Sequence, residues 1–180
     1  MAFERTAKTV TRAVTRFDLL VREDYEAFCR RFEGAVPSFD RNRTAALLER
    51  GAAWPEIVAD VAASARHHFQ LYWKLDLTPL MSLAGNAHRA AEYLMGNHVI
   101  AETMYRHDPA VGLYVPLRCL IYERDDDTHF GVEQPSSALA SLDCEAIARV
   151  GSDLDRKLAE LLAVLNVTVP ETLSRSAPRV

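Results

Sequence analysis

Long hydrophobic runs are missing from this chain of 180 residues, because charged or polar residues interrupt every apolar stretch. A membrane-spanning helix needs about 20 consecutive apolar residues, so we expect no membrane span. The first 16 residues carry a charge every few positions and lack the apolar core of a secretory signal. The cytoplasm is therefore the expected location.

Cysteine is scarce as well. The chain has three, Cys29, Cys119 and Cys144, which lie far apart and in no metal-ligand spacing. An odd number of isolated cysteines is typical of a reducing compartment and excludes a disulfide framework. The sequence also lacks a glycine-rich phosphate loop, a nucleophile elbow and a paired-cysteine motif. We expect no metal and no cofactor.

The chain has few basic residues relative to acidic ones. It contains 21 Lys and Arg and 25 Asp and Glu, which gives a net charge of −4. A duplex-binding protein needs a basic face that neutralises phosphates, so we expect no nucleic-acid partner. The first quarter of the chain is nevertheless locally basic, through Arg12, Arg16, Arg30, Arg31, Arg41 and Arg43.

The composition that remains, 49% hydrophobic and 26% charged, is that of an ordinary globular protein. We expect one α+β domain over residues 1–167 and a loose tail over residues 168–180. Alternating residues predict a strand over 9–21, with Phe17, Leu19 and Val21 on one face. A helix over 23–33 and a helical insertion over about 42–66, made of helices at 44–50 and 55–65, follow.

Four more strands are predicted, at residues 68–76, 90–95, 112–123 and 128–133, with a short helix at 99–107 and a long final helix at 143–165. Phe69, Leu71, Trp73 and Leu75 are expected to point inward from the 68–76 strand. The 112–123 strand is almost continuously apolar, which predicts that both of its faces are covered. This order predicts a mainly antiparallel sheet covered by helices on one face.

Several short motifs resemble those of the bacterial and archaeal family catalogued as domain of unknown function 302. They are Gly96-Asn97, Asp108-Pro109, Val115-Pro116-Leu117-Arg118, Asp125-Asp126-Asp127 and Gln134-Pro135. The resemblance covers roughly residues 66–165, with the 42–66 helices as an addition. His98 stands where the family usually has proline, and Leu117 where many members have cysteine.

The resemblance implies a compact α+β fold similar to the TATA-binding-protein class (TBP-like), in the order β-α-β-β-β-β-α, and a homodimer. It implies no activity, and a shared fold would not supply one.

Arg118 is the first candidate site residue. It lies in an apolar strand with Tyr114, and its five donors must be satisfied by a carboxylate, by carbonyls or by an anionic ligand. As an anion anchor it would work with Tyr114, whose hydroxyl needs a polar neighbour. The alternative is an ion pair with Glu92 or Glu133 that joins sheet to helix.

Asn97 and His98 lie at the expected start of the short helix, where backbone N–H groups attract anions. Together with Arg118 they could hold a carboxylate or phosphate. The alternative is that Asn97 only caps the helix.

His98 and Glu102 are four residues apart and share a helix face, with Glu92 as a further acid–base candidate. An ordinary surface pair is the simpler interpretation, and two residues are too few for a metal site. Cys119 could be a nucleophile, but its position in the alternation favours a buried, inert thiol.

Three functions remain open. The first is binding of a small anionic molecule in a pocket between the sheet and the short helix, by Asn97, His98, Arg118 and Tyr114. The second is an enzyme that uses Glu92 or Glu102 with His98, while Arg118 orients the substrate. The third is an interaction module whose 42–66 helices form the partner surface.

Overall fold

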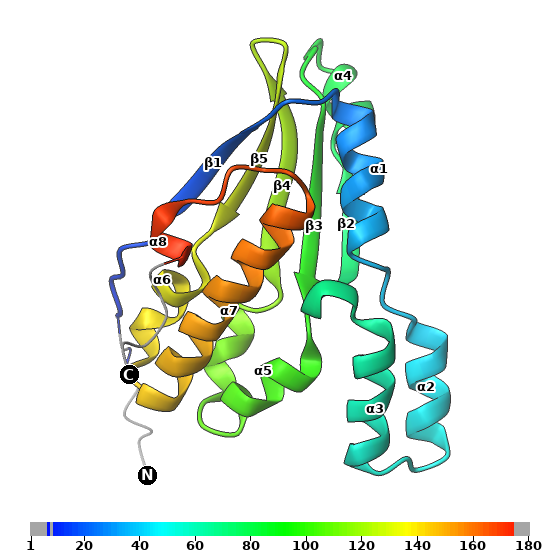
Figure 1. Cartoon of the computed structure of the whole chain (residues 1–180), viewed down its shortest axis with the longest axis vertical. Coiled ribbons are helices and arrows are strands. Elements are labelled where there is room, and N and C mark those ends of the chain that lie inside the picture. Colours follow the sequence, from blue (N-terminus) through cyan, green and yellow to red (C-terminus); the bar gives the residue numbers. More distant parts are fainter. Residues whose placement is uncertain (1–6, 8, 175–180) are drawn as a thin grey trace.

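The protein is described from a computed structural model that covers residue 7 and residues 9–174. A five-stranded sheet, in which every neighbouring pair is antiparallel, forms its centre (Figure 1), in the order β1-β5-β4-β3-β2. The strands are β1 (Arg16–Val21), β2 (Gln70–Asp76), β3 (Ala90–Gly96), β4 (Leu117–Arg124) and β5 (Asp127–Glu133). The five strands follow one another along the chain as the sequence predicted, whereas their order within the sheet comes from the structure.

The described residues also form eight α-helices and three short 3-10 helices. The α-helices are α1 (Tyr25–Ala35), α2 (Arg41–Glu49), α3 (Trp54–Ser64), α4 (Thr78–Ser82), α5 (His98–Tyr105), α6 (Pro135–Leu139), α7 (Glu145–Val164) and α8 (Glu171–Ser174). The 3-10 helices are η1 (Arg66–His68), η2 (Pro109–Leu113) and η3 (Ala140–Leu142). The structure thus has the α+β class that the sequence predicted.

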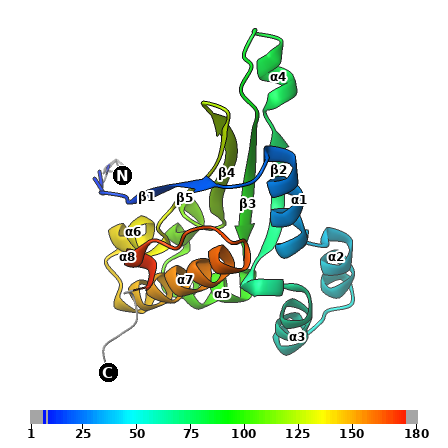
Figure 2. The ribbon, with the colours of Figure 1, turned by 45° about the horizontal axis from the view of Figure 1, so that its top comes forward.

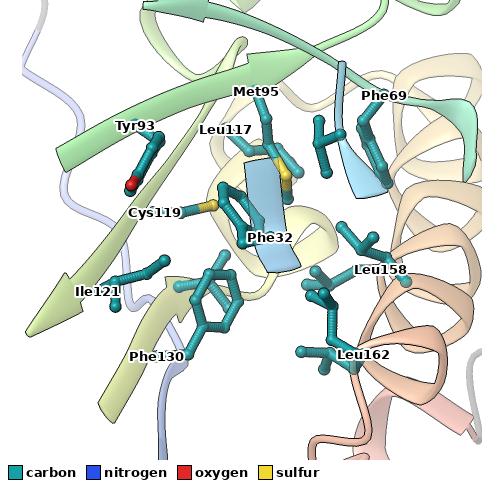
Figure 3. Packing of buried hydrophobic residues seen from close by; sticks show 14 of the residues in the cluster. Phe32, Phe69, Tyr93, Met95, Leu117, Cys119, Ile121, Phe130, Leu158 and Leu162 are labelled. Carbon is teal, nitrogen blue, oxygen red and sulfur yellow. The ribbon is translucent and has the colours of Figure 1, made fainter. Parts of the chain in front are cut away.

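The core lies between one face of the sheet and the two helices α1 and α7. Phe32 of α1 lies among Tyr93, Met95, Leu117, Cys119, Ile121 and Phe130 from three strands, with Leu158 and Leu162 of α7 on its other side (Figure 3). Helix α1 begins directly after Asp24, whose carboxylate caps it by accepting a hydrogen bond from Ala27 N at 2.9 Å. The prediction that helices cover one face is confirmed.

The opposite face of the sheet is open, and this corrects the prediction that both faces of β4 are covered. Leu117, Cys119 and Ile121 are buried, whereas Arg118 is exposed and Leu120 is half-buried. The apolar run looked continuous because its first residues, up to Leu113, belong to η2 rather than to the strand. Within the true strand, only alternate residues face the helices.

The predicted inward face of β2 is wrong beyond its first residues. Phe69 and Leu71 are buried, but Trp73 and Leu75 are 39% and 42% exposed. A β-bulge between Leu71 and Trp73 shifts the register against β3 by one residue. One extra residue moves all the following side chains to the other face.

Helix α7 buries an apolar stripe that includes Ile147, Leu154 and Leu158. The charged residue Asp155 of the same helix is fully buried as well. Helix α6, for which the sequence predicted only the end of a strand, packs against α7 there. Residues 168–174 are not loose: α8 contacts α7, and Leu173 is fully buried. Residues 175–180 of the expected tail lie outside the described part of the chain.

Helices α2 and α3 follow α1, where the sequence places an insertion, and lie beside the main body (Figures 1 and 2). Helix α2 has no buried residue, and α3 buries Ile57 and Val61. In Figure 2 the β2–β3 connection, which carries α4, extends away from the body.

Among residues 7 and 9–174, no helix is both long enough and apolar enough to cross a membrane.

Candidate functional site

Two concave regions meet at the start of β4, one on each side of the sheet. The first, the open-face hollow, has a volume of about 450 Å³. Its lining is Arg12, Arg16, Phe17, Asp18, Leu94, Leu113, Tyr114, Pro116, Leu117, Arg118, Cys119, Leu120, Tyr122, Arg124, Gly131, Val132, Glu133 and Ala138. The second, the α5 cavity, has a volume of about 210 Å³. Its lining is Phe69, Tyr72, Gly96, Asn97, His98, Ile100, Ala101, Met104, Val115, Pro116, Leu117 and Leu154.

Arg118 points to the open face, because its neighbour Leu117 points into the core. Its side chain is 77% exposed, and it forms an ion pair with Glu92, with Nε 2.9 Å from Oε1. This is the ion pair that the sequence left as the alternative. It joins adjacent strands, β4 and β3, rather than the sheet and a helix.

The open-face hollow has an excess of positive charge. Four arginines line it, Arg12, Arg16, Arg118 and Arg124, against the two carboxylates Asp18 and Glu133. The chain as a whole has a net charge of −4. The hollow therefore has the opposite sign to the average of the molecule.

Arg124 is paired with Asp18 and is therefore not available to a ligand. The Asp18 carboxylate accepts hydrogen bonds from Tyr122 Oη at 2.6 Å and Arg124 Nη1 at 3.0 Å, and its Oδ1 lies 2.9 Å from His129 Nδ1. Burial acts to raise the pKa of Asp18, but the bonds to Tyr122, Arg124 and His129 outweigh it and hold the pKa below its ordinary value. At this edge of the hollow, Asp18 and Arg124 therefore neutralise each other.

Arg12 forms the wall next to α6. Its guanidinium lies 4.6 Å from the centre of the Tyr114 ring, and its Nη1 donates to Ala138 O at 3.0 Å. The Tyr114 hydroxyl in turn accepts a hydrogen bond from Ser141 Oγ at 3.1 Å. Tyr114 thus lines the open-face hollow, and its hydroxyl is held by η3.

Two cations remain available to a ligand. The Arg16 side chain has no hydrogen-bond or ion-pair partner among the residues that the structure describes, although its backbone belongs to the β1–β5 ladder. Arg118 forms an ion pair with Glu92, but its side chain is 77% exposed and stays accessible from solvent. The sequence signal for Arg12 and Arg16 was the basic first quarter of the chain, but nothing in it showed that these residues lie beside Arg118.

At the start of α5, the backbone donors already have partners. Asn97 Oδ1 accepts from Val99 N at 3.0 Å and Ile100 N at 3.2 Å, and Tyr72 Oη accepts from His98 N at 3.0 Å. Gly96 permits this arrangement, since a Cβ there would lie 3.2 Å from atoms of Tyr72 and Pro116. The capping interpretation of Asn97 therefore describes the helix start.

The predicted pocket shared by Arg118 and the start of α5 is not formed. Arg118 and Tyr114 line the open-face hollow, whereas Asn97 and His98 line the α5 cavity. The physical reason is the alternation of β4: Leu117 lies between the two spaces and contributes to both, while Arg118 points to the open face alone.

The three acid–base candidates do not converge. Glu102 forms an ion pair with Arg106, Glu92 binds Arg118, and the His98 ring binds Tyr72. His98 lines the α5 cavity, whereas Glu92 and Glu102 line neither concave region. Cys119 is fully buried, and its burial raises the pKa of the thiol, so the thiolate is disfavoured.

Among residues 7 and 9–174, no three His, Cys, Asp or Glu side chains lie close enough together to hold a metal ion.

Comparison with known proteins gives one family and one fold. The family model described as "Domain of unknown function DUF302" matches residues 51–165. That match includes α3 and leaves α2 outside, so it begins earlier than the resemblance seen in the sequence. No curated protein gives a significant match.

A solved structure described as "Crystal structure of uncharacterized conserved protein DUF302 from Bacillus stearothermophilus" is similar to this chain, with a TM-score of 0.60 and 14% identity. The similarity covers 83% of this chain and 97% of the other. At this identity it shows a shared fold.

Proposed function

Because the chain belongs to the family of DUF302 domains, whose description names no activity, we propose a function from the site alone: binding of a small anionic molecule in the open-face hollow. The observation that carries the proposal is the pair of available arginines, Arg16 and Arg118, at the rim of a concave region with excess positive charge. A guanidinium offers two parallel donors to a carboxylate or phosphate.

The remaining walls suit a small molecule. Leu94 and Leu120 supply apolar surface from neighbouring strands, and Tyr114 supplies an aromatic ring held by Arg12. Small-molecule sites usually combine apolar walls with a few polar groups. The anion is placed in this hollow rather than beside α5, because the α5 cavity lacks a charged residue in its described lining.

Replacing Arg118 with glutamine is expected to weaken the binding of anions such as citrate or inorganic phosphate by about tenfold or more. The reason is the loss of a charge-assisted hydrogen bond, which contributes about 1.5–3 kcal/mol. Isothermal titration calorimetry of the purified chain at low salt measures the effect. Arg118 is exposed, so the fold should not change.

Arg149→Gln is the matched control. It removes the same charge from another exposed ion pair, Arg149 with Glu145 on α7, and should leave anion affinity unchanged. The proposal fails if no anion in a panel of carboxylates and phosphates binds, or if both variants bind equally well.

Replacing Glu92 with glutamine separates the binding and enzyme hypotheses. If Glu92 only competes for Arg118, its neutralisation should raise anion affinity about two- to fivefold, the range expected for releasing a partly exposed ion pair. If Glu92 were a general base, the same change would abolish turnover instead. Parallel calorimetry of both proteins gives the answer, and a weaker complex with Glu92→Gln would contradict the competition.

The homodimer implied by the family resemblance remains a proposal, which the uncovered sheet face favours. Trp73 and Leu75, on the edge strand β2, are 39% and 42% exposed there, and exposed apolar patches commonly mark protein contacts. Sedimentation velocity of the purified chain tests it, and a monomer at every concentration would argue against it.

The cytoplasm likewise remains the proposed location. The three cysteines are unpaired, as is usual where thiols stay reduced.

A further inference from the structure

The α5 cavity has a different chemistry from the open-face hollow. Its walls are apolar side chains from α5, β4, α7 and the residue before β2, among them Phe69, Met104, Leu117 and Leu154. These four are buried. No charged residue belongs to its lining in the described part of the chain. An ionised ligand would lose its hydration there without gaining a counter-charge.

Two of the three polar side chains in this lining are already used. Asn97 Oδ1 accepts two backbone hydrogen bonds, and Asn97 Nδ2 donates to His68 O at 3.0 Å. Tyr72 Oη accepts the hydrogen bond of His98 N and lies 2.9 Å from His98 Nδ1. The remaining group is the His98 ring.

Tyr72 favours one tautomer of that ring. Its Oη accepts from His98 N and can donate its own hydrogen to His98 Nδ1, which lies 2.9 Å away. In this arrangement the ring proton is on Nε2. Burial lowers the pKa of His98, which favours this neutral form. Nε2–H has no partner among the described residues and is free to donate.

We infer that the α5 cavity is a second binding site, which takes an uncharged, mainly apolar molecule with one hydrogen-bond acceptor directed at His98 Nε2. Sites for drug-sized ligands usually measure about 300–1,000 Å³, so the volume of about 210 Å³ suits a single aromatic ring with a short substituent. The inference does not depend on anion binding, because the ligand classes and the lining charges differ.

Two probes of nearly the same shape test the acceptor. Acetophenone carries a carbonyl where α-methylstyrene carries a CH₂ group. Titration of the whole chain, followed by NMR signals of the His98 ring and of the Ile100 and Met104 methyl groups, should show saturable binding of acetophenone. α-Methylstyrene should bind about three- to tenfold more weakly, the ratio expected for one neutral hydrogen bond.

Two variants of α5 test the location. Ala101→Phe fills the cavity and should abolish acetophenone binding, whereas Thr103→Phe adds the same side chain at an exposed position outside the lining and should leave it unchanged. Arg118→Gln should also leave acetophenone binding unchanged, which separates this site from the open-face hollow.

The inference is overturned if acetophenone does not saturate, if both probes bind equally, or if Ala101→Phe binds acetophenone as the unchanged protein does. Should Ala101→Phe not fold, nuclear Overhauser effects in the unchanged protein decide. Contacts from the probe to the methyl groups of Ile100 and Met104 support the site, and their absence at saturating probe overturns it.

Discussion

Replacing Asp155 with alanine is expected to lower the free energy of unfolding by about 3–5 kcal/mol. The Asp155 carboxylate is fully buried and accepts hydrogen bonds from Gln134 Nε2 at 2.7 Å, Ser136 N at 2.9 Å and Ser136 Oγ at 2.6 Å. Alanine leaves these donors without their acceptor, and each unsatisfied buried group costs about 1–3 kcal/mol. Urea denaturation followed by circular dichroism measures the loss.

Asp155→Asn provides the graded control, because it keeps one acceptor oxygen and should cost less than alanine. A loss below about 1 kcal/mol for Asp155→Ala would show that water replaces the carboxylate, since a net hydrogen bond is worth about that much. The same contacts matter for the open-face hollow. Asp155 holds Ser136 on α6, and α6 carries Ala138, whose carbonyl accepts the hydrogen bond from Arg12.

Replacing Phe32 with alanine is expected to lower the free energy of unfolding by about 3–5 kcal/mol as well, the usual cost of removing a buried aromatic ring. Phe32 is fully buried, and its ring centre lies 5.0 Å from that of Tyr93 and 5.5 Å from that of Phe130. In Figure 3 its side chain lies between the sheet and α7. Deleting the ring leaves a cavity that β3, β5 and α7 border.

Chemical denaturation of Phe32→Ala and Phe32→Leu compares the cavity with a smaller change in shape at the same site, and leucine should recover a large part of the loss. Leu48→Ala on α2 is the exposed control and should change stability by less than about 0.5 kcal/mol. If Phe32→Ala proved as stable as Leu48→Ala, the packing of α1 on the sheet would be wrong.

Local periodicity correctly predicted the elements that keep one face toward the core along their whole length. In β1, Phe17 and Val21 of the predicted face are buried and Leu19 is half-buried. The turn between β4 and β5 falls between the strands predicted at 112–123 and 128–133, and its residues Asp125 and Asp126 both have the positive φ that a tight turn of this kind needs. The similarity to the TATA-binding-protein class stays a prediction.

The predictions of side-chain direction were wrong where a local change of backbone conformation reversed the faces of a strand or shortened it. The bulge after Leu71 turned Trp73 and Leu75 to the open face, and η2 took residues that looked like the start of β4. The bulge has no clear local signature, because it depends on the neighbouring strand. The start of η2 does have one, since Asp108 caps it and Pro109 occupies its first turn.

In the candidate site, too, some features could be predicted from local sequence and others depended on strand pairing. The sequence identified Arg118, its possible ion pair with Glu92, Tyr114 as a lining residue and Asn97 as a helix cap. It could not place Arg118 beside Arg12 and Arg16, more than 100 positions earlier in the chain, because the pairing of β1 with β5 brings them together. It also could not show that Asp155 is buried.

By itself, then, the sequence determined the α+β class, the order of the strands and the family, since these follow from periodicity and short motifs within each segment. Only the tertiary structure decided which face of the sheet is left open, which charges gather on it, and that His98 and Arg118 lie in separate spaces. The physical reason is that exposure and charge proximity depend on strand pairing and register, which are set by contacts between distant segments.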